Sequence, residues 1–150
     1  MGKFPGNNLL YFAFDDGVNG LELWKSDGTE AGTTMVKDIN PNGSSDVRNI
    51  VQTGSEVFFT ASENPFQGGG LWKSDGTESG TVLIKQFSGG TYGKIIIMGD
   101  ELFFQADDGV HGLELWKSDG TESGTVMVKD INIGGYTEIR ELTVVSNILF

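Results

Sequence analysis

One ten-residue phrase occurs three times in this chain. It reads WKSDGTEAGT at residues 24–33 and WKSDGTESGT at residues 72–81 and 116–125. Its tryptophans are 48 and 44 residues apart, a mean period of about 46 residues, and periods of 40–50 residues are typical of propeller blades. Catalytic residues are seldom written in triplicate, whereas structural units are. The phrase therefore predicts a repeat architecture.

Short segments of high β propensity divide each period into four predicted strands. They are rich in Val, Ile, Phe, Thr and Trp and are separated by turn residues. No stretch of ten or more residues combines helical spacing with freedom from glycine, so we expect an all-β chain. In the middle period the four strands are predicted at 47–53, 56–61, 70–74 and 81–87, with counterparts in the other two.

The second predicted strand of each period contains two adjacent aromatic residues. Successive side chains of a strand point to opposite faces, so both faces of each sheet must be covered. Four-stranded sheets stacked as the blades of a β-propeller meet this requirement, and a β-sandwich, which would alternate apolar and polar residues, is the second choice. The pairs are Tyr11–Phe12, Phe58–Phe59 and Phe103–Phe104.

The repeats predict a single domain over residues 1–150. Repeat 1 covers about 8–53, repeat 2 about 54–99 and repeat 3 about 100–146, and 147–150 begin a fourth. Propellers have four to eight blades, so three repeats do not close a ring. We expect either an excerpt of a longer array or a homodimer of six blades, in which residues 139–150 complete the neighbour's first blade. Amplification or engineering for propeller assembly would also explain the closeness of the copies.

The repeated phrase is predicted to form a rigid corner between the third and fourth strands. Asp accepts hydrogen bonds from nearby backbone N–H groups, Gly tolerates positive φ, and Thr braces the turn through its hydroxyl, together with the preceding Ser26, Ser74 or Ser118. The tryptophan is expected to pack between blades with its N–H bound to a backbone acceptor; exposure for stacking on a sugar is the alternative. The corner residues are Trp24, Asp27, Gly28, Thr29, Trp72, Asp75, Gly76, Thr77, Trp116, Asp119, Gly120 and Thr121.

The segments LELWKSDGTEAGT (21–33) and LELWKSDGTESGT (113–125) resemble the ELWxxDGT repeat family, and the flanking FAFDDGVNG and MVKDINPNGSS fit its pattern. The resemblance implies a β-propeller-like array from a large bacterial protein, secreted or at the cell surface, without known catalytic residues. The middle copy departs from the pattern. There GGGLWKSDG lacks the glutamate, and SENPFQGGG (62–70) replaces the acidic loop.

Two acidic loops, DDGVNG and DDGVHG, are candidate calcium sites. Calcium takes six to eight oxygen ligands, more than two adjacent carboxylates supply, so a tight turn with Asp as a turn residue is the competing interpretation. His111 occupies the place of Asn19, and a lone histidine makes a poor zinc site. The candidate ligands are Asp15, Asp16, Asp107 and Asp108; no other cofactor is expected.

The net charge of −11 disfavours nucleic acid and anionic membranes as partners. No apolar stretch is long enough to predict a membrane span, and the chain has no cysteine for thiol chemistry. The lysines are spread regularly and are predicted to lie on solvated strand edges that block aggregation. They are Lys25, Lys37, Lys73, Lys85, Lys117 and Lys129.

These features favour a non-enzymatic module. No histidine recurs at a fixed distance from the corner serines, and no carboxylate pair is distinguished from the other acids. We expect a structural or adhesive β-propeller that displays near-identical loops to a surface protein or glycan, so that weak contacts add. A lectin-like propeller, with a sugar pocket between blades lined by Trp and Asp, is the alternative and requires exposed indoles.

Overall fold

Every regular secondary-structure element in the described part of the chain is a β-strand, and the strands pair antiparallel. The all-β prediction is therefore confirmed. The computed structural model describes residues 9–64, 66–131, 133, 139, 142, 144–145 and 148–149. Sheet 1 contains β1 (Leu10–Asp15), β2 (Leu21–Ser26) and β3 (Thr34–Lys37). Sheet 2 contains β4 (Arg48–Thr53), β5 (Glu56–Ala61), β6 (Gly69–Ser74) and β7 (Val82–Phe87). Sheet 3 contains β8 (Gly90–Met98), β9 (Glu101–Asp107), β10 (Leu113–Ser118) and β11 (Val126–Lys129).

Within each sheet the strands pair in chain order, and the register repeats from sheet to sheet. Trp72 on β6 lies opposite Phe59 on β5 and Leu83 on β7. In sheets 1 and 3 the equivalent tryptophans lie opposite a phenylalanine and a methionine at the same positions. A register shift falls immediately before the tryptophan in all three sheets. The repeated phrase therefore encodes a repeated local structure.

The end of the chain contributes a short hairpin of β12 (Val144–Val145) and β13 (Ile148–Leu149). Val144 pairs with Leu149, the register that Gln52 has with Val57 in sheet 2. Most of 139–150 lies outside the described residues. The prediction that this segment completes a neighbour's first blade stays untested.

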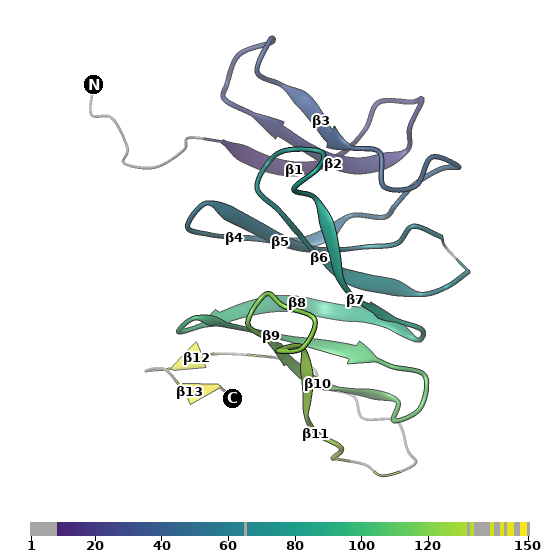
Figure 1. Cartoon of the computed structure of the whole chain (residues 1–150), viewed down its shortest axis with the longest axis vertical. Helices are drawn as coiled ribbons and strands as arrows, with labels where there is room; N and C mark the ends of the chain where they lie inside the picture. Colours follow the sequence, from purple (N-terminus) through teal and green to yellow (C-terminus); the bar gives the residue numbers. More distant parts are fainter. Residues whose placement is uncertain are drawn as a thin grey trace.

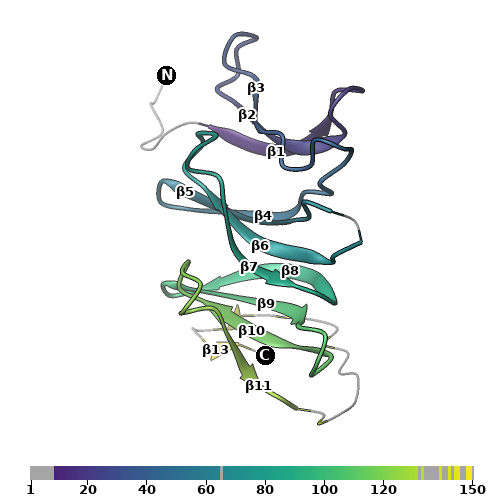
Figure 2. The same ribbon diagram turned by 45° about the vertical axis from the view of Figure 1, so that its right-hand side comes forward.

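The three sheets stack face to face, with sheet 2 between the other two (Figures 1 and 2). Sheets 1 and 3 lie at opposite ends of the stack, so the described part of the chain does not form a closed ring. This arrangement leaves one broad face of sheet 1 at one end and the outer part of one face of sheet 3 at the other, whereas Phe103 on β9 is buried.

Sheet 2 is buried on both faces, as its adjacent aromatics predict. The same prediction is not met for sheet 1, where Tyr11 and Phe12 are only half-buried. Phe59 packs in the core shared with sheet 1, whereas Phe58 packs in the core shared with sheet 3. Each fully buried aromatic contributes about 1.5–3 kcal/mol, so the two cores are the main source of stability. The first core comprises Leu23, Val36, Ile39, Val47, Val57, Phe59, Ala61 and Trp72. The second comprises Phe58, Leu71, Ile84, Phe87, Ile95, Leu102, Phe104, Ala106 and Trp116.

The two connections between sheets differ in length. Residues 38–47 lead from β3 to β4, whereas only residues 88–89 separate β7 from β8. The long connection is anchored by the buried carboxylate of Glu22, which accepts hydrogen bonds from Ile39 N at 2.9 Å and from Ser45 N and Oγ at 3.0 and 2.7 Å. Sheet 2 has Gly70 in place of Glu22, where the following connection is too short to need such an anchor.

Candidate functional site

Each DGT corner is closed by a set of side-chain hydrogen bonds. In the first corner Asp27 Oδ1 accepts from Thr29 N at 2.9 Å and Thr29 Oγ1 at 2.7 Å, and Thr29 Oγ1 accepts from Gly32 N at 2.9 Å. The hydroxyls of Ser26 and Thr33 lie 2.7 Å apart across the base of the loop. The same bonds recur in the other two corners. The serine that precedes each Asp–Gly pair is thus part of the corner.

These hydrogen bonds favour the ionised form of the corner carboxylates and engage one oxygen of each. The hydroxyl of Thr29 and then its N–H hold the pKa of Asp27 below its ordinary value, and equivalent threonines act in the same way on Asp75 and Asp119. A carboxylate that already accepts these bonds at a turn serves structure. Each corner carboxylate therefore braces its own turn.

The second and third corners also pack against the preceding sheet. Gly76 has a φ of 88°, and a Cβ there would meet the Tyr11 hydroxyl at 2.5 Å. Its carbonyl accepts a 2.7 Å hydrogen bond from Lys25 Nζ of sheet 1. Gly120 faces the Phe58 ring in the same way, but Gly28 of the first corner has open space around it. Only the first corner lacks a preceding sheet.

The three tryptophans differ in burial and in hydrogen bonding. Trp72 and Trp116 are buried between sheets, whereas Trp24 is half-buried on the end face of sheet 1. Trp116 Nε1 donates to the carbonyl of Ala106 at 3.1 Å. The N–H groups of Trp24 and Trp72 have no such acceptor among the described residues, so the expected bond holds for one indole only.

The prediction that the lysines lie on strand edges is wrong for Lys25, Lys73 and Lys117, which are on the inner strands β2, β6 and β10. Lys37, Lys85 and Lys129 are on the outer strands β3, β7 and β11, but some of them also bind the next sheet. Lys25 Nζ, as above, binds a carbonyl of the second corner, and Lys37 Nζ binds another, that of Thr81, at 3.0 Å. Lys37 also lies over the Trp72 ring at 5.9 Å, and Lys85 lies over the Trp116 ring at 5.6 Å. A cation over an indole is attracted by the ring's negative face. These lysines thus join one sheet to the next.

The acidic loops use their carboxylates to cap their own turns. Asp15 Oδ1 accepts from Gly17 N at 2.8 Å, and Asp16 Oδ1 accepts from Val18 N and Asn19 N at 2.9 and 2.8 Å. The loop of Asp107 and Asp108 repeats these bonds. No group of three or more His, Cys, Asp or Glu side chains that could hold a metal ion occurs in the described part of the chain. The geometry fits the turn interpretation of these aspartates.

His111 is held by the aspartate that caps its loop. Its Nδ1 lies 2.7 Å from Asp108 Oδ2, in the position where Asn19 Nδ2 donates to Asp16 in the first loop. This bond raises the pKa of His111 above its ordinary value. Partial burial tends to raise the pKa of Asp108, but the bonds from His111 and Val110 outweigh it and leave the pKa lowered. We call the His111–Asp108 pair, which closes this loop, the histidine clasp.

A polar hollow of about 390 Å³ lies where the starts of β4 and β8 approach each other. Its wall combines hydroxyl groups, glycine backbone, an exposed Asp46–Arg48 ion pair of 2.8 Å and the ring of Tyr92, whose hydroxyl donates to the Gly89 carbonyl at 2.8 Å. The lining residues are Ser44, Ser45, Asp46, Arg48, Thr60, Ala61, Ser62, Gly68, Gly69, Gly89, Gly90, Thr91 and Tyr92.

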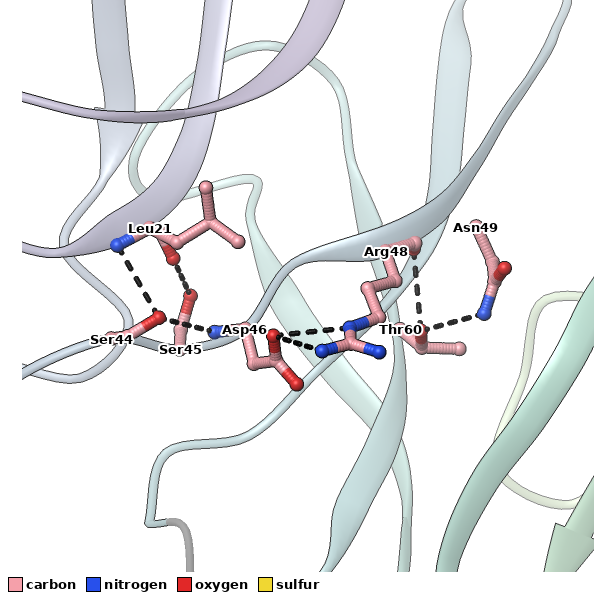
Figure 3. A network of polar contacts seen from close by, with 7 residues as sticks. All are labelled: Leu21, Ser44, Ser45, Asp46, Arg48, Asn49 and Thr60. Atoms are coloured by element: carbon pink, nitrogen blue, oxygen red, sulfur yellow. Dashed lines mark hydrogen bonds and ion pairs between the residues drawn. The ribbon is translucent and has the colours of Figure 1, made fainter.

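A chain of hydrogen bonds, drawn in Figure 3, connects Asp46, Arg48 and Thr60, which line one side of this hollow. Arg48 donates to Asp46 Oδ1 through Nε at 3.0 Å and Nη2 at 2.8 Å, and its carbonyl accepts from Thr60 Oγ1 at 3.2 Å. Asp46 and Asn49 are the non-glycine residues with positive φ in the described chain, at 54° and 55°. Asp and Asn adopt such φ values more readily than other non-glycine residues. The hollow, with its exposed ion pair and its hydroxyl groups, is the candidate binding site.

Sequence reasoning missed this hollow and the buried Glu22. The hollow joins residues 44–48, 60–62, 68–69 and 89–92, which come together only because sheets 2 and 3 stack. The signal available in the sequence was asymmetry, because the GGGLW segment (68–72) occurs in the middle copy and replaces LELW there. Glu22 is the glutamate of the repeated LELW segment. The middle copy lacks this glutamate, and the connection that follows that copy is the short one.

Comparison with known proteins does not assign the chain to a family. No protein-family model matches the chain, and no characterised protein is similar enough in sequence to count as a relative. In the part of the chain that the structure describes, no helix has the length and apolar character needed to cross a membrane.

Proposed function

We propose that this chain is a non-enzymatic β-propeller module with a structural or adhesive role, in which the three sheets are blades of a ring that a second chain completes. The ELWxxDGT resemblance supports a bacterial source and a place outside the cell or at its surface. The function would be multivalent display, because equivalent loops are presented at regular intervals and weak contacts add.

The observation that carries this proposal is the repeated contact between neighbouring sheets. Lys37 of sheet 1 covers Trp72 of sheet 2, and Lys85 of sheet 2 covers Trp116 of sheet 3. Corner glycines meet the preceding sheet's aromatic residue in both places. Since equivalent residues make both contacts, each sheet is related to the next by a similar rotation. Repetition of a similar rotation generates a ring when the angle closes.

The test is a tandem chain in which two copies are joined end to end. A propeller of six blades predicts that the tandem chain is monomeric by light scattering and forms round particles with a central channel by electron microscopy. An elongated particle, in which added repeats lengthen a rod, would overturn the ring and favour an open solenoid.

The polar hollow favours a second function, binding of a glycan. Hydroxyls, an Asp–Arg pair and an aromatic ring are groups that orient a polyhydroxylated ligand. In this second proposal the glycan binds at Arg48 and Tyr92 and not at the tryptophans, since Trp72 and Trp116 are buried.

Titration with a panel of mono- and oligosaccharides, followed by NMR of the backbone amides of the hollow, tests the second function. Glycan binding predicts shifts at Gly90 and Thr91 that are lost in Arg48→Ala and Tyr92→Ala and kept in Val110→Ala, which alters an exposed loop outside the hollow. Absence of shifts at millimolar sugar would exclude this function.

A further inference from the structure

The two end faces of the stack expose residues that are buried elsewhere in the repeat. Leu10 of sheet 1 is 65% exposed, whereas its equivalent in sheet 2, Val57, is fully buried. Phe14 is 49% exposed and lies edge-on to Trp24 at 5.6 Å. We call this surface the front face; it consists of Leu10, Phe12, Phe14 and Trp24.

The opposite end shows the complementary difference. Val128 of β11 is 46% exposed, although its equivalents Val36 and Ile84 are 6% exposed. Ile131 is 57% exposed, whereas Ile39 at the same position of the first repeat is 5% exposed. We call this surface, on the outer part of sheet 3, the rear face; it consists of Leu115, Val128, Lys129 and Ile131. On the inner strand β9, Phe103 and Gln105 of the same side are already buried.

Inside the chain, front and rear surfaces already fit each other twice. The front surface of sheet 2, with Phe59 and Trp72, packs on the rear surface of sheet 1, with Val36 and Ile39. The front surface of sheet 3 packs on the rear surface of sheet 2 in the same way. The exposed front face of sheet 1 thus has the residue types that a rear face covers, and the rear face of sheet 3 has those that a front face receives.

The lysine–tryptophan contacts also match rear surfaces to front surfaces, because the lysine comes from the rear of one sheet and the tryptophan from the front of the next. Lys37 covers Trp72 and Lys85 covers Trp116, so a series that continued would place Lys129 over a tryptophan equivalent to Trp24. Lys129 is exposed, and Trp24 is half-buried without a covering lysine among the described residues. Each end of the chain therefore presents one half of a contact that the interior makes twice.

We infer that the front face binds the rear face of a second copy of this chain, head to tail, with Lys129 of one copy over Trp24 of the other. The inference rests on the proposed function, because it names the residues by which a second chain would complete the ring. Such a contact is heterologous: two different surfaces meet, and two copies bind through two such contacts if the rotation closes. Because both copies carry a net charge of −11, added salt strengthens the association by screening their repulsion.

Paired variants of the two faces test the inference by light scattering and sedimentation of the full chain. The front variant is Leu10→Asp with Phe14→Asp, and the rear variant is Val128→Asp with Ile131→Asp. These residues are exposed, so circular dichroism should show the wild-type fold. Val18→Asp with Val110→Asp, in exposed loop tips, is the matched control.

The wild-type protein and the control are expected to have the mass of two chains at tens of micromolar, and each face variant the mass of one chain. An equimolar mixture of the two face variants should again contain two-chain species, because one intact front face meets one intact rear face. That species has one contact only, so it should dissociate at least about tenfold more readily than the wild-type pair, which has two.

Three results would overturn the inference. The first is a monomeric wild-type chain at these concentrations in 0.15 M and in 0.5 M salt. The second is a front variant that still self-associates while the rear variant does not, or the reverse, since either pattern indicates a contact between like faces. The third is a mixture that stays monomeric. A round, monomeric tandem chain would leave the propeller proposal standing in all three cases, so the two failures are distinguishable.

Discussion

Trp24 and Trp72 occupy the same place in the same phrase, yet their surroundings differ. Trp72 lies between two sheets, stacks on Phe59 with ring centroids 6.4 Å apart and is covered by Lys37. Trp24 lies on an end face beside the exposed Phe14. The comparison shows that the phrase specifies the strand and the corner, while the neighbouring sheet determines the burial of the indole.

The largest expected effect is on the buried indole. Trp72→Ala leaves a cavity in the core between sheets 1 and 2 and should lower the free energy of unfolding by about 3–5 kcal/mol. Trp24→Ala removes a half-buried ring and should cost about half as much or less. Urea unfolding of both variants, followed by circular dichroism, makes the comparison; equal losses would show that the end face of sheet 1 is covered in solution.

The next effect concerns Glu22, which anchors the long connection. Glu22→Ala leaves the N–H groups of Ile39 and Ser45 without their acceptor and should lower the free energy of unfolding by about 1–3 kcal/mol at neutral pH. Urea unfolding measures this loss, and a variant as stable as the wild type would contradict the anchoring role.

The carboxyl of Glu22 should also make the free energy of unfolding depend on pH. Burial raises the pKa of Glu22 above its ordinary value, against the hydrogen bonds from Ile39 and Ser45. The folded protein therefore keeps this proton to a higher pH than the unfolded chain does. The associated stabilisation is present at low pH and is lost as the pH rises through the folded pKa. Glu22→Gln should flatten this part of the profile of unfolding free energy against pH.

A smaller effect separates two corner glycines with nearly the same φ. Gly28→Ala places a Cβ at a φ of 89° in open space and should cost about 1 kcal/mol. Gly76→Ala adds a contact with the Tyr11 hydroxyl and should lower the melting temperature further. Combining Gly76→Ala with Tyr11→Phe should restore the loss to that of Gly28→Ala. A thermal melt that ranks Gly28→Ala as the worse variant would contradict this account.

The smallest effect is expected at the histidine clasp. The hydrogen bond to Asp108 raises the pKa of His111, so its stabilising contribution is present below the ordinary histidine pKa and is lost as the pH rises through the folded value. His111→Asn should keep the bond, as Asn19 does in the first loop, and abolish the dependence. Melting temperatures between pH 5 and 8 measure the difference, and NMR titration of the ring gives the direction of the shift.

Much of the local structure could be predicted because it depends on short segments. Adjacent aromatics such as Phe58 and Phe59 indicated a sheet buried on both faces, and the structure places these two rings in separate cores. The residue types of the corner indicated a turn braced by its own side chains. Both features are set within about ten residues of chain, where spacing and residue type suffice.

The lysines and the polar hollow could not be predicted in this way. Lys37 looks like an ordinary exposed strand residue until sheet 2 places Trp72 beneath it. The hollow needs Arg48 and Tyr92, from the first strands of two different sheets, to lie near each other. Such contacts depend on how the sheets stack, and the sequence of a repeat does not give the angle between successive sheets.

By itself, the sequence determined that this chain forms antiparallel strands and where its corners lie, because alternation along a strand and the conformational preferences of Gly, Asp and Thr act over a few residues. Only the tertiary structure decided which tryptophans are buried, which lysines join neighbouring sheets and where a hollow opens. The physical reason is that the burial of a sheet face is a property of the pair of sheets in contact, and the sheets at either end of this stack carry the same residues without the same neighbour.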